Sequence, residues 1–120
     1  MQRFDIDDPD VDIDFGHRLL YKGKPISGEV EEYQRGSLIS REEYSDGIRQ
    51  GPTQEWHRNG LLKSQGIHHR GVLVGEFREW HSNGTLAKLT VNNDTGTKIL
   101  TIQEWDEDGN LTKYWQADNA

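Results

Sequence analysis

The sequence predicts an all-β protein, an antiparallel meander of about eight short strands in which four β-hairpin repeats form a single twisted open sheet. Three observations predict this fold. One unit recurs four times, glycine-containing turns return about every 12 residues, and no usable segment free of glycine keeps the apolar spacing of a helix.

The repeat is clearest in residues 44–67, whose glycine, aromatic and leucine positions recur in the units before and after. Unit by unit, these positions are Gly23, Gly28, Tyr33, Gly36, Leu38; Gly47, Gly51, Trp56, Gly60, Leu62; Gly71, Gly75, Trp80, Gly84, Leu86; and Gly96, Leu100, Trp105, Gly109, Leu111. The last unit has Leu100 in place of the second glycine. A period in the low twenties is typical of an array whose units bury apolar side chains against their neighbours.

Each unit is predicted to be a hairpin because its turns carry dipeptides that accept a positive φ at low cost. These dipeptides are Asp46-Gly47, Asn59-Gly60, Asn83-Gly84 and Asp108-Gly109. Lys22-Gly23, Arg35-Gly36, Arg70-Gly71 and Thr95-Gly96 occupy equivalent places. Turns at this spacing leave room for strands but not for helices of usual length.

One aromatic residue stands at the same position of every unit, which predicts an aromatic ladder on one side of the sheet. The members are Tyr33, Trp56, Trp80 and Trp105. Large flat side chains can supply the core of a thin array, and we favour this structural role over the stacking of a ligand.

A glutamate precedes each of these aromatic residues, so a carboxylate column is expected on the opposite face. Its members are Glu32, Glu55, Glu79 and Glu104. A uniform exposed column lacks the asymmetry that separates a general acid from a general base, so we expect no catalysis here. The column is either a solvated face or a binding surface for a basic partner.

The chain divides into three expected parts: an acidic N-terminal arm over 1–19, a repeat domain over 20–115 and a frayed tail over 116–120. The arm either pairs with the first edge of the sheet or stays solvated, and both alternatives remain open. It is a second candidate binding surface because of its aspartates, which are Asp5, Asp7, Asp8, Asp10, Asp12 and Asp14.

Composition excludes several classes of function. The net charge is −7 and the basic residues are not concentrated, which argues against nucleic acid and against anionic lipid and favours a basic protein partner. Without cysteine there is no disulfide or thiolate chemistry. Since no signal sequence or membrane-length apolar run is present, we expect a cytoplasmic protein.

No catalytic or metal-binding constellation stands out. His57 and His81 hold equivalent repeat positions, but an intervening strand should separate them, and the adjacent His68 and His69 should face opposite sides of a strand. No serine lies in a G-x-S-x-G turn. We therefore expect neither a metal, nor a cofactor, nor enzymatic activity.

The unit Y-x-x-G-x-x-x-G-x-x-x-E-W-x-x-N-G-x-L-x-S, at residues 44–64, resembles the MORN-repeat variant of the bacterial YwqK-type antitoxin family. The lead-in YKGKPISG at residues 21–28 is similar to the entry to the first repeat of that family. The resemblance implies a non-enzymatic antitoxin, or immunity protein, that binds a cognate toxin domain and occludes its active site. The alternative is a MORN-like scaffold that organises other proteins or a membrane surface.

Overall fold

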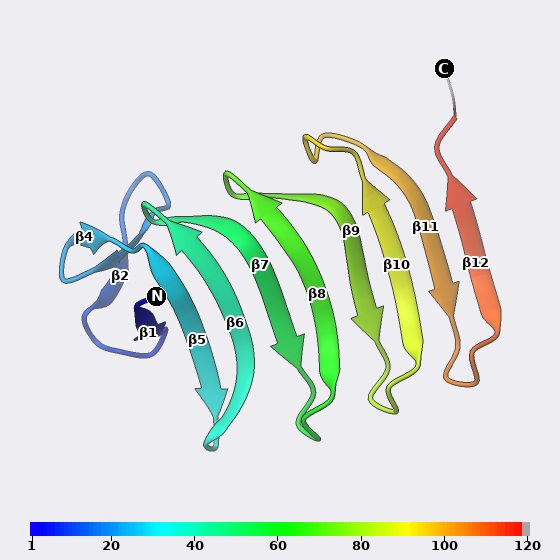
Figure 1. Ribbon diagram of the computed structural model, residues 1–120, viewed down its shortest axis with the longest axis horizontal. Coiled ribbons are helices and arrows are strands. Elements are labelled where there is room, and N and C mark those ends of the chain that lie inside the picture. Colours follow the sequence, from blue (N-terminus) through cyan, green and yellow to red (C-terminus); the bar gives the residue numbers. More distant parts are fainter. Residues whose placement is uncertain (119–120) are drawn as a thin grey trace.

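The computed structural model describes residues 1–118, which form two β-sheets and contain no helix (Figure 1). The large sheet has nine strands in the order β1-β5-β6-β7-β8-β9-β10-β11-β12, and the small sheet has three in the order β2-β3-β4. The strand bounds are β1 (Arg3–Asp5), β2 (Val11–Ile13), β3 (Leu19–Tyr21), β4 (Lys24–Pro25), β5 (Gly28–Gln34), β6 (Ser37–Ser45), β7 (Ile48–Trp56), β8 (Leu62–His69), β9 (Val72–Trp80), β10 (Leu86–Asn92), β11 (Ile99–Trp105) and β12 (Leu111–Gln116). The all-β prediction is confirmed.

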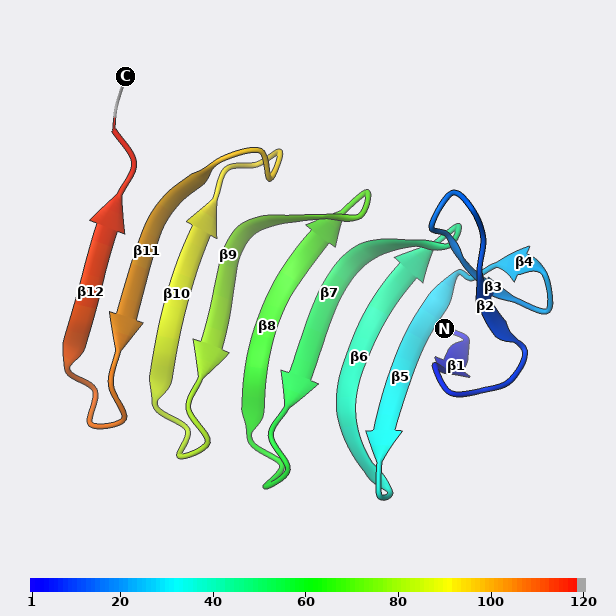
Figure 2. The ribbon, with the colours of Figure 1, turned by 180° about the vertical axis from the view of Figure 1, so that it is seen from behind.

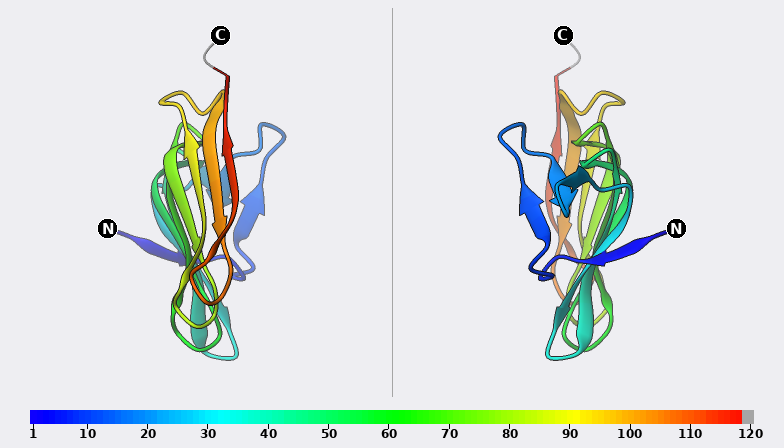
Figure 3. Two further views of the ribbon diagram at one scale, coloured as in Figure 1. Left: turned by 90° about the vertical axis from the view of Figure 1, so that its right-hand side faces the viewer. Right: turned by 90° about the vertical axis from the view of Figure 1, so that its left-hand side faces the viewer.

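From β5 to β12, each strand pairs antiparallel with the next strand along the chain, as the hairpin pattern predicts. Seen edge-on, these strands lie in one layer (Figure 3). The chain measures 47 × 39 × 23 Å along its principal axes. In the views from the front and from behind, no other described element covers β7 to β12 (Figure 2). Both faces of this part of the sheet are therefore open.

The small sheet corrects the expectation of one sheet with about eight strands. Strand β2 pairs antiparallel with β3, and β3 pairs with β4, so the first predicted hairpin leaves the large sheet. The small sheet is tied to the large one through the turn after β6, where the Leu19 amide donates to the Gly47 carbonyl and the Gly47 amide to the Ile26 carbonyl. The aspartate-rich arm supplies the extra strand, because Val11 and Ile13 alternate with aspartate as a strand requires.

Strand β1 occupies the first edge of the large sheet, which is one of the two alternatives that the sequence leaves open for the arm. It pairs in parallel with β5, with Phe4 opposite Val30. The pairing brings the Gln2 carbonyl against Gly28, where a Cβ would collide with that backbone oxygen. This close approach explains why a glycine begins β5.

The buried apolar core lies at this N-terminal end. Among the described residues, the buried apolar side chains are Leu19, Ile26 and Val30, and the partly buried ones that pack against them are Phe4, Ile6, Val11, Tyr21 and Tyr44. Phe4 and Tyr21 form a tilted ring pair with centroids 5.2 Å apart. The arm thus contributes to the core through its apolar residues, while its aspartates stay near solvent.

The glycine dipeptides mark the turns, and the structure divides them into two kinds. In the tight turns both residues have positive φ, as at Asp46 (52°) and Gly47 (80°) or Arg70 (50°) and Gly71 (85°). This geometry suits the twist of a two-residue hairpin. At Asn59-Gly60 only the glycine has positive φ, and the loop is closed by the His57 amide donating to the Leu61 carbonyl.

A β-bulge recurs where each glutamate–aromatic pair ends its strand. The pairing register shifts at Glu32/Tyr33, Glu55/Trp56, Glu79/Trp80 and Glu104/Trp105. In each case the pairing skips one residue of the return strand, namely Ile39, Lys63, Ala87 or Thr112. A second register shift lies near Gly51 in β7 and near Gly75 in β9, where both glycines have positive φ. It is also present in β11 at Leu100, which takes the place of this glycine. Leucine therefore does not abolish this irregularity.

The end of the chain is only partly covered by the structure. Gln116 belongs to β12, and the Ala117 amide donates to the Leu100 carbonyl, so the sheet continues past Trp115. Of the expected frayed tail 116–120, residues 119–120 lie outside the described residues. Within residues 1–118, no helix is long and apolar enough to cross a membrane.

Candidate protein-binding surfaces

The predicted glutamate column forms one cross-strand row, because residues directly opposite each other in a sheet point to the same face. In the paired register, the row alternates glutamate with serine or lysine. Its members in strand order are Glu32, Ser40, Glu55, Ser64, Glu79, Lys88, Glu104 and Lys113. We call the face that carries this row the glutamate face.

The two halves of this row differ in charge. Glu79 and Glu104 are both opposite Lys88, and Glu104 also forms an ion pair with Lys113 at 3.5 Å. Glu32 and Glu55 are exposed and are directly opposite only serines, although Arg58 and Lys63 line a shallow hollow together with Glu55. The Ser64 hydroxyl donates to Glu55 at 2.8 Å. Uncompensated negative charge, in the sense of glutamates with no lysine directly opposite, is therefore concentrated in the first half of the row, a difference that the glutamate positions alone do not reveal.

The aspartates of the arm hold its own turns together. The carboxylates of Asp5, Asp8 and Asp12 accept the backbone amides of Asp7, Asp10 and Ile13 in turn. Such short side-chain to backbone bonds are the usual reason for aspartate in turns. The candidate acidic surface of the arm is thus also a structural feature.

Asp14 has the most partners in the arm. Its carboxylate accepts the Arg18 amide at 2.8 Å and pairs with the Arg18 guanidinium at 3.3 Å. The hydrogen bond from the Arg18 amide, followed by the charge of the guanidinium, holds the pKa of Asp14 below its usual value. Asp14 is consequently less available to an outside partner than the other arm aspartates.

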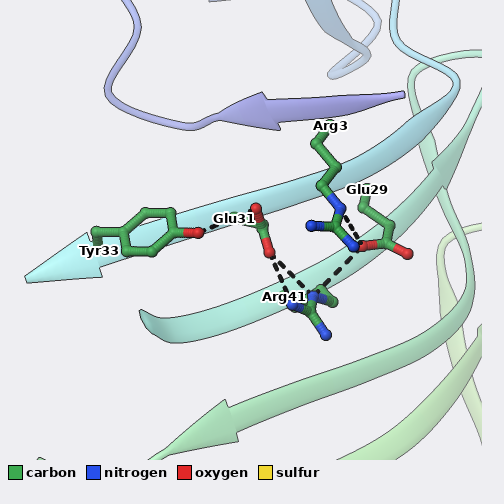
Figure 4. A network of polar contacts seen from close by, with 5 residues as sticks. All are labelled: Arg3, Glu29, Glu31, Tyr33 and Arg41. Carbon is green, nitrogen blue, oxygen red and sulfur yellow. Dashed lines mark hydrogen bonds and ion pairs between the residues drawn. The ribbon is translucent and has the colours of Figure 1, made fainter. Parts of the chain in front are cut away.

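The opposite face carries a buried ion pair near the first edge (Figure 4). Glu31 is only 6% exposed, and one of its oxygens accepts from both Nε and Nη2 of Arg41, at 3.0 and 2.9 Å. The Tyr33 hydroxyl donates to its other oxygen at 3.2 Å. Glu29 pairs with Arg41 at 3.3 Å and with Arg3 at 3.6 Å. We call this side of the sheet the arginine face.

The arginine face also contains a depression of about 710 Å³ in the middle of the sheet. Ile67 and Val74 are directly opposite each other there, beside a polar row of Gln54, Gln65 and Arg78. Ile67 is 54% exposed. An exposed apolar patch within a polar surround is typical of a contact surface.

The aromatic column does not form the buried core that the sequence led us to expect, because the buried apolar side chains lie at the N-terminal end of the sheet. Each member is directly opposite a leucine, namely Leu38, Leu62, Leu86 or Leu111. Tyr33 is exposed, and Trp56, Trp80 and Trp105 are only partly buried. The Arg41 guanidinium lies 5.7 Å from the Trp56 ring centroid, which places that ring on the arginine face, opposite to Glu55.

The two equivalent histidines join neighbouring hairpins. The Nε2 atom of His57 donates to the Trp80 carbonyl, and that of His81 donates to the Trp105 carbonyl, both at 2.8 Å. Beside them, Asn59 donates to the Ser82 carbonyl and Asn83 to the Glu107 carbonyl, at 2.7 and 3.0 Å. We call these contacts the histidine and asparagine clasps. In the sequence, the equivalent repeat positions of His57 and His81 are the feature that indicates this structural role.

The remaining histidines do not assemble into a site. Within residues 1–118, no group of three or more His, Cys, Asp or Glu side chains is arranged to hold a metal ion. His68 is partly buried, and its Nδ1 atom is buried without a hydrogen-bond partner among the described residues. Burial, with a smaller contribution from Arg49, lowers the pKa of His68.

Comparison with known proteins identifies no relative. No family model, no curated protein sequence and no solved structure matches the chain.

Proposed function

We propose that this chain is a protein-binding domain of four MORN-like hairpin repeats that acts as an antitoxin or immunity protein. It neutralises a cognate toxin by covering the toxin's active site and itself performs no chemistry. The observation that carries the proposal is the open single-layer sheet, whose faces from β7 to β12 are uncovered in the views of the described residues. Such a sheet offers broad contact area on a fixed frame.

The recurring contacts support a repeat architecture. The bulge at the glutamate–aromatic pair occurs in the four hairpins β5–β6, β7–β8, β9–β10 and β11–β12. The histidine and asparagine clasps each occur twice, at spacings of 23 or 24 residues. Contacts between neighbouring units are what hold a linear array together. The resemblance of the unit to antitoxin repeats supplies the functional class.

The charge distribution supports a basic partner. Glu32 and Glu55 form the uncompensated half of the glutamate row, and the arm adds several exposed aspartates. Acidic groups at the rim of an interface accelerate the encounter with a basic surface and select against acidic ones. A partner with a basic active-site rim, such as an enzyme that acts on nucleic acid, fits this pattern, and we place the encounter in the cytoplasm.

The proposal is tested by co-expressing the chain with the protein encoded immediately upstream of its gene in a bacterial host. We expect the upstream protein alone to stop growth, and the chain to restore growth and to co-purify with it. A matched control replaces the chain by its Gly28→Ala variant, in which the first edge is disrupted. Growth arrest that persists despite equal expression of the folded parent chain contradicts the proposal.

A further inference from the structure

The last strand of the large sheet has an unpaired outer edge within residues 1–118. Strand β12 pairs with β11 on one side only, and all of its residues are exposed. Its exposed side chains include Tyr114 (57%) and Trp115 (42%). An edge strand of this kind is a template for pairing with another strand.

The hydrogen-bonding pattern shows which groups point outward. In an antiparallel pair, residues alternate between those that bond to the neighbouring strand and those that point away from it. The Ala117 amide bonds to Leu100 on β11, so Trp115 and Lys113 also face β11. The amides and carbonyls of Tyr114 and Gln116 consequently point to the free edge.

We propose that β12 pairs antiparallel with β12 of a second copy of this chain, giving a symmetric dimer with one continuous sheet. The two residues whose backbone groups point outward, Tyr114 and Gln116, are two positions apart. Tyr114 of each copy is therefore opposite Gln116 of the other, and four backbone hydrogen bonds form. Trp115 then lies opposite Trp115 of the second copy, next to the two-fold axis, and both side chains are on the glutamate face. Cross-strand aromatic pairs of this type stabilise sheets.

The surroundings of Trp115 favour a second copy over an unrelated strand. Trp115 ends a cross-strand row that runs from Phe77 through Thr90 and Ile102 to the edge. A two-fold axis at Trp115 joins this row to the same row of the second copy, so an uncharged side chain lies at the centre of the contact. Lys113 is then opposite Ala117 of the other copy, so no like charges are directly opposed.

The other edge of the sheet explains why assembly stops at two copies. That edge is formed by β1, which has three residues, pairs in parallel and carries Arg3 and Asp5. Short charged edges resist further pairing. An isologous contact through β12 closes, whereas a contact between β12 and β1 would propagate as a filament.

The dimer is tested by sedimentation equilibrium of the full chain, with charges placed at the two-fold axis. Edge pairing buries less than about 1,200 Å², so we expect a weak dimer that dissociates on dilution. In a dimer of Trp115→Lys, or of Trp115→Glu, two side chains of the same charge would face each other across the two-fold axis, so each variant alone should be a monomer. Mixed in equal amounts, they oppose unlike charges and should form a heterodimer. Ile67→Lys, at another exposed apolar residue away from the edge, should dimerise like the parent.

A parent chain that remains monomeric up to millimolar concentration overturns the proposal. So does a dimer that survives either charge variant, a mixture that stays monomeric, or growth beyond two copies. Amide hydrogen exchange gives a measurement that does not depend on variants. Tyr114 and Gln116 should become protected as the concentration rises, whereas Trp115 should be protected at every concentration. Concentration-dependent protection elsewhere, without change at Tyr114, would place the contact on another surface.

Discussion

The imidazole of His57 donates a 2.8 Å hydrogen bond to the backbone carbonyl of Trp80, one hairpin further along the sheet. His81 repeats this contact with Trp105. In the fourth hairpin Asp106 takes the equivalent position, and its carboxylate instead accepts the amides of Asp108 and Asn110. The clasps therefore join the second hairpin to the third and the third to the fourth, and the fourth hairpin uses the same position to close its own loop.

Removing a clasp should loosen the array. We expect His57→Ala to lower the free energy of unfolding by about 1 kcal/mol, the net value of a hydrogen bond, and His57→Ala with His81→Ala to lower it by about twice that amount. Urea denaturation measures the loss. Arg58→Ala, at an exposed neighbouring position, is the control and should change little. Equal effects of His57→Ala and Arg58→Ala would show that the clasp contributes nothing.

Two turn glycines with the same backbone geometry differ in what surrounds them. Gly96 and Gly109 have φ of 70° and 87°, but a Cβ at Gly96 would collide with Val72 and the Leu73 carbonyl, whereas one at Gly109 meets nothing within 4 Å. We expect Gly96→Ala to cost at least about 1 kcal/mol more than Gly109→Ala in thermal unfolding, because only the first also disturbs packing between hairpins. Similar melting temperatures would contradict this.

Among the ion pairs, loss of the pair between Arg41 and Glu31 should lower the stability of the fold most. Arg41→Ala leaves the Glu31 carboxylate buried without its main partner, and we expect a loss of about 3 kcal/mol or more. Arg78→Ala removes an exposed pair with Glu76 and should cost less than about 1 kcal/mol. Chemical denaturation of both variants measures the difference. A smaller loss for Arg41→Ala than for Arg78→Ala would be inconsistent with the buried network.

His68 should make stability depend on pH. Burial lowers its pKa in the folded chain, so below its ordinary value near 6.5 the unfolded chain binds more protons. Stability should therefore fall as the pH decreases from 6.5 towards the lowered folded-state pKa. His68→Leu should flatten this part of the curve, whereas His69→Leu, at an exposed position, should not. An unchanged slope for His68→Leu would rule out this contribution.

The sequence predicts the large sheet well because its signals are local. The glycine dipeptides mark each turn, and alternation along a strand places Glu55 and Trp56 on opposite faces. The register then brings the predicted glutamates into one row. Turn geometry and strand period are encoded within a few residues, which is why they can be predicted without an alignment.

The features that sequence analysis misses or leaves open are those that depend on distant contacts. Parallel pairing of β1 with β5 joins residues about 26 positions apart and has no local signal. Through this pairing Phe4 of β1 lies opposite Val30 and packs against the core that includes Ile26. Lys88 and Lys113 become part of the glutamate row only through the register. Deleting the arm to probe binding would consequently remove Phe4 and Ile6 from the core as well.

The most direct test of the proposed function measures the affinity of the chain for the protein encoded immediately upstream, which the proposal takes to be the toxin, by isothermal titration calorimetry. Glu32→Gln with Glu55→Gln removes two charges from the uncompensated half of the row. Glu79→Gln with Glu104→Gln removes the same charge from the half that contains Lys88 and Lys113. We expect the first pair to weaken binding about tenfold or more, and the second pair to weaken it markedly less. The absence of binding by the folded parent chain, or equal losses for the two pairs, would contradict the account.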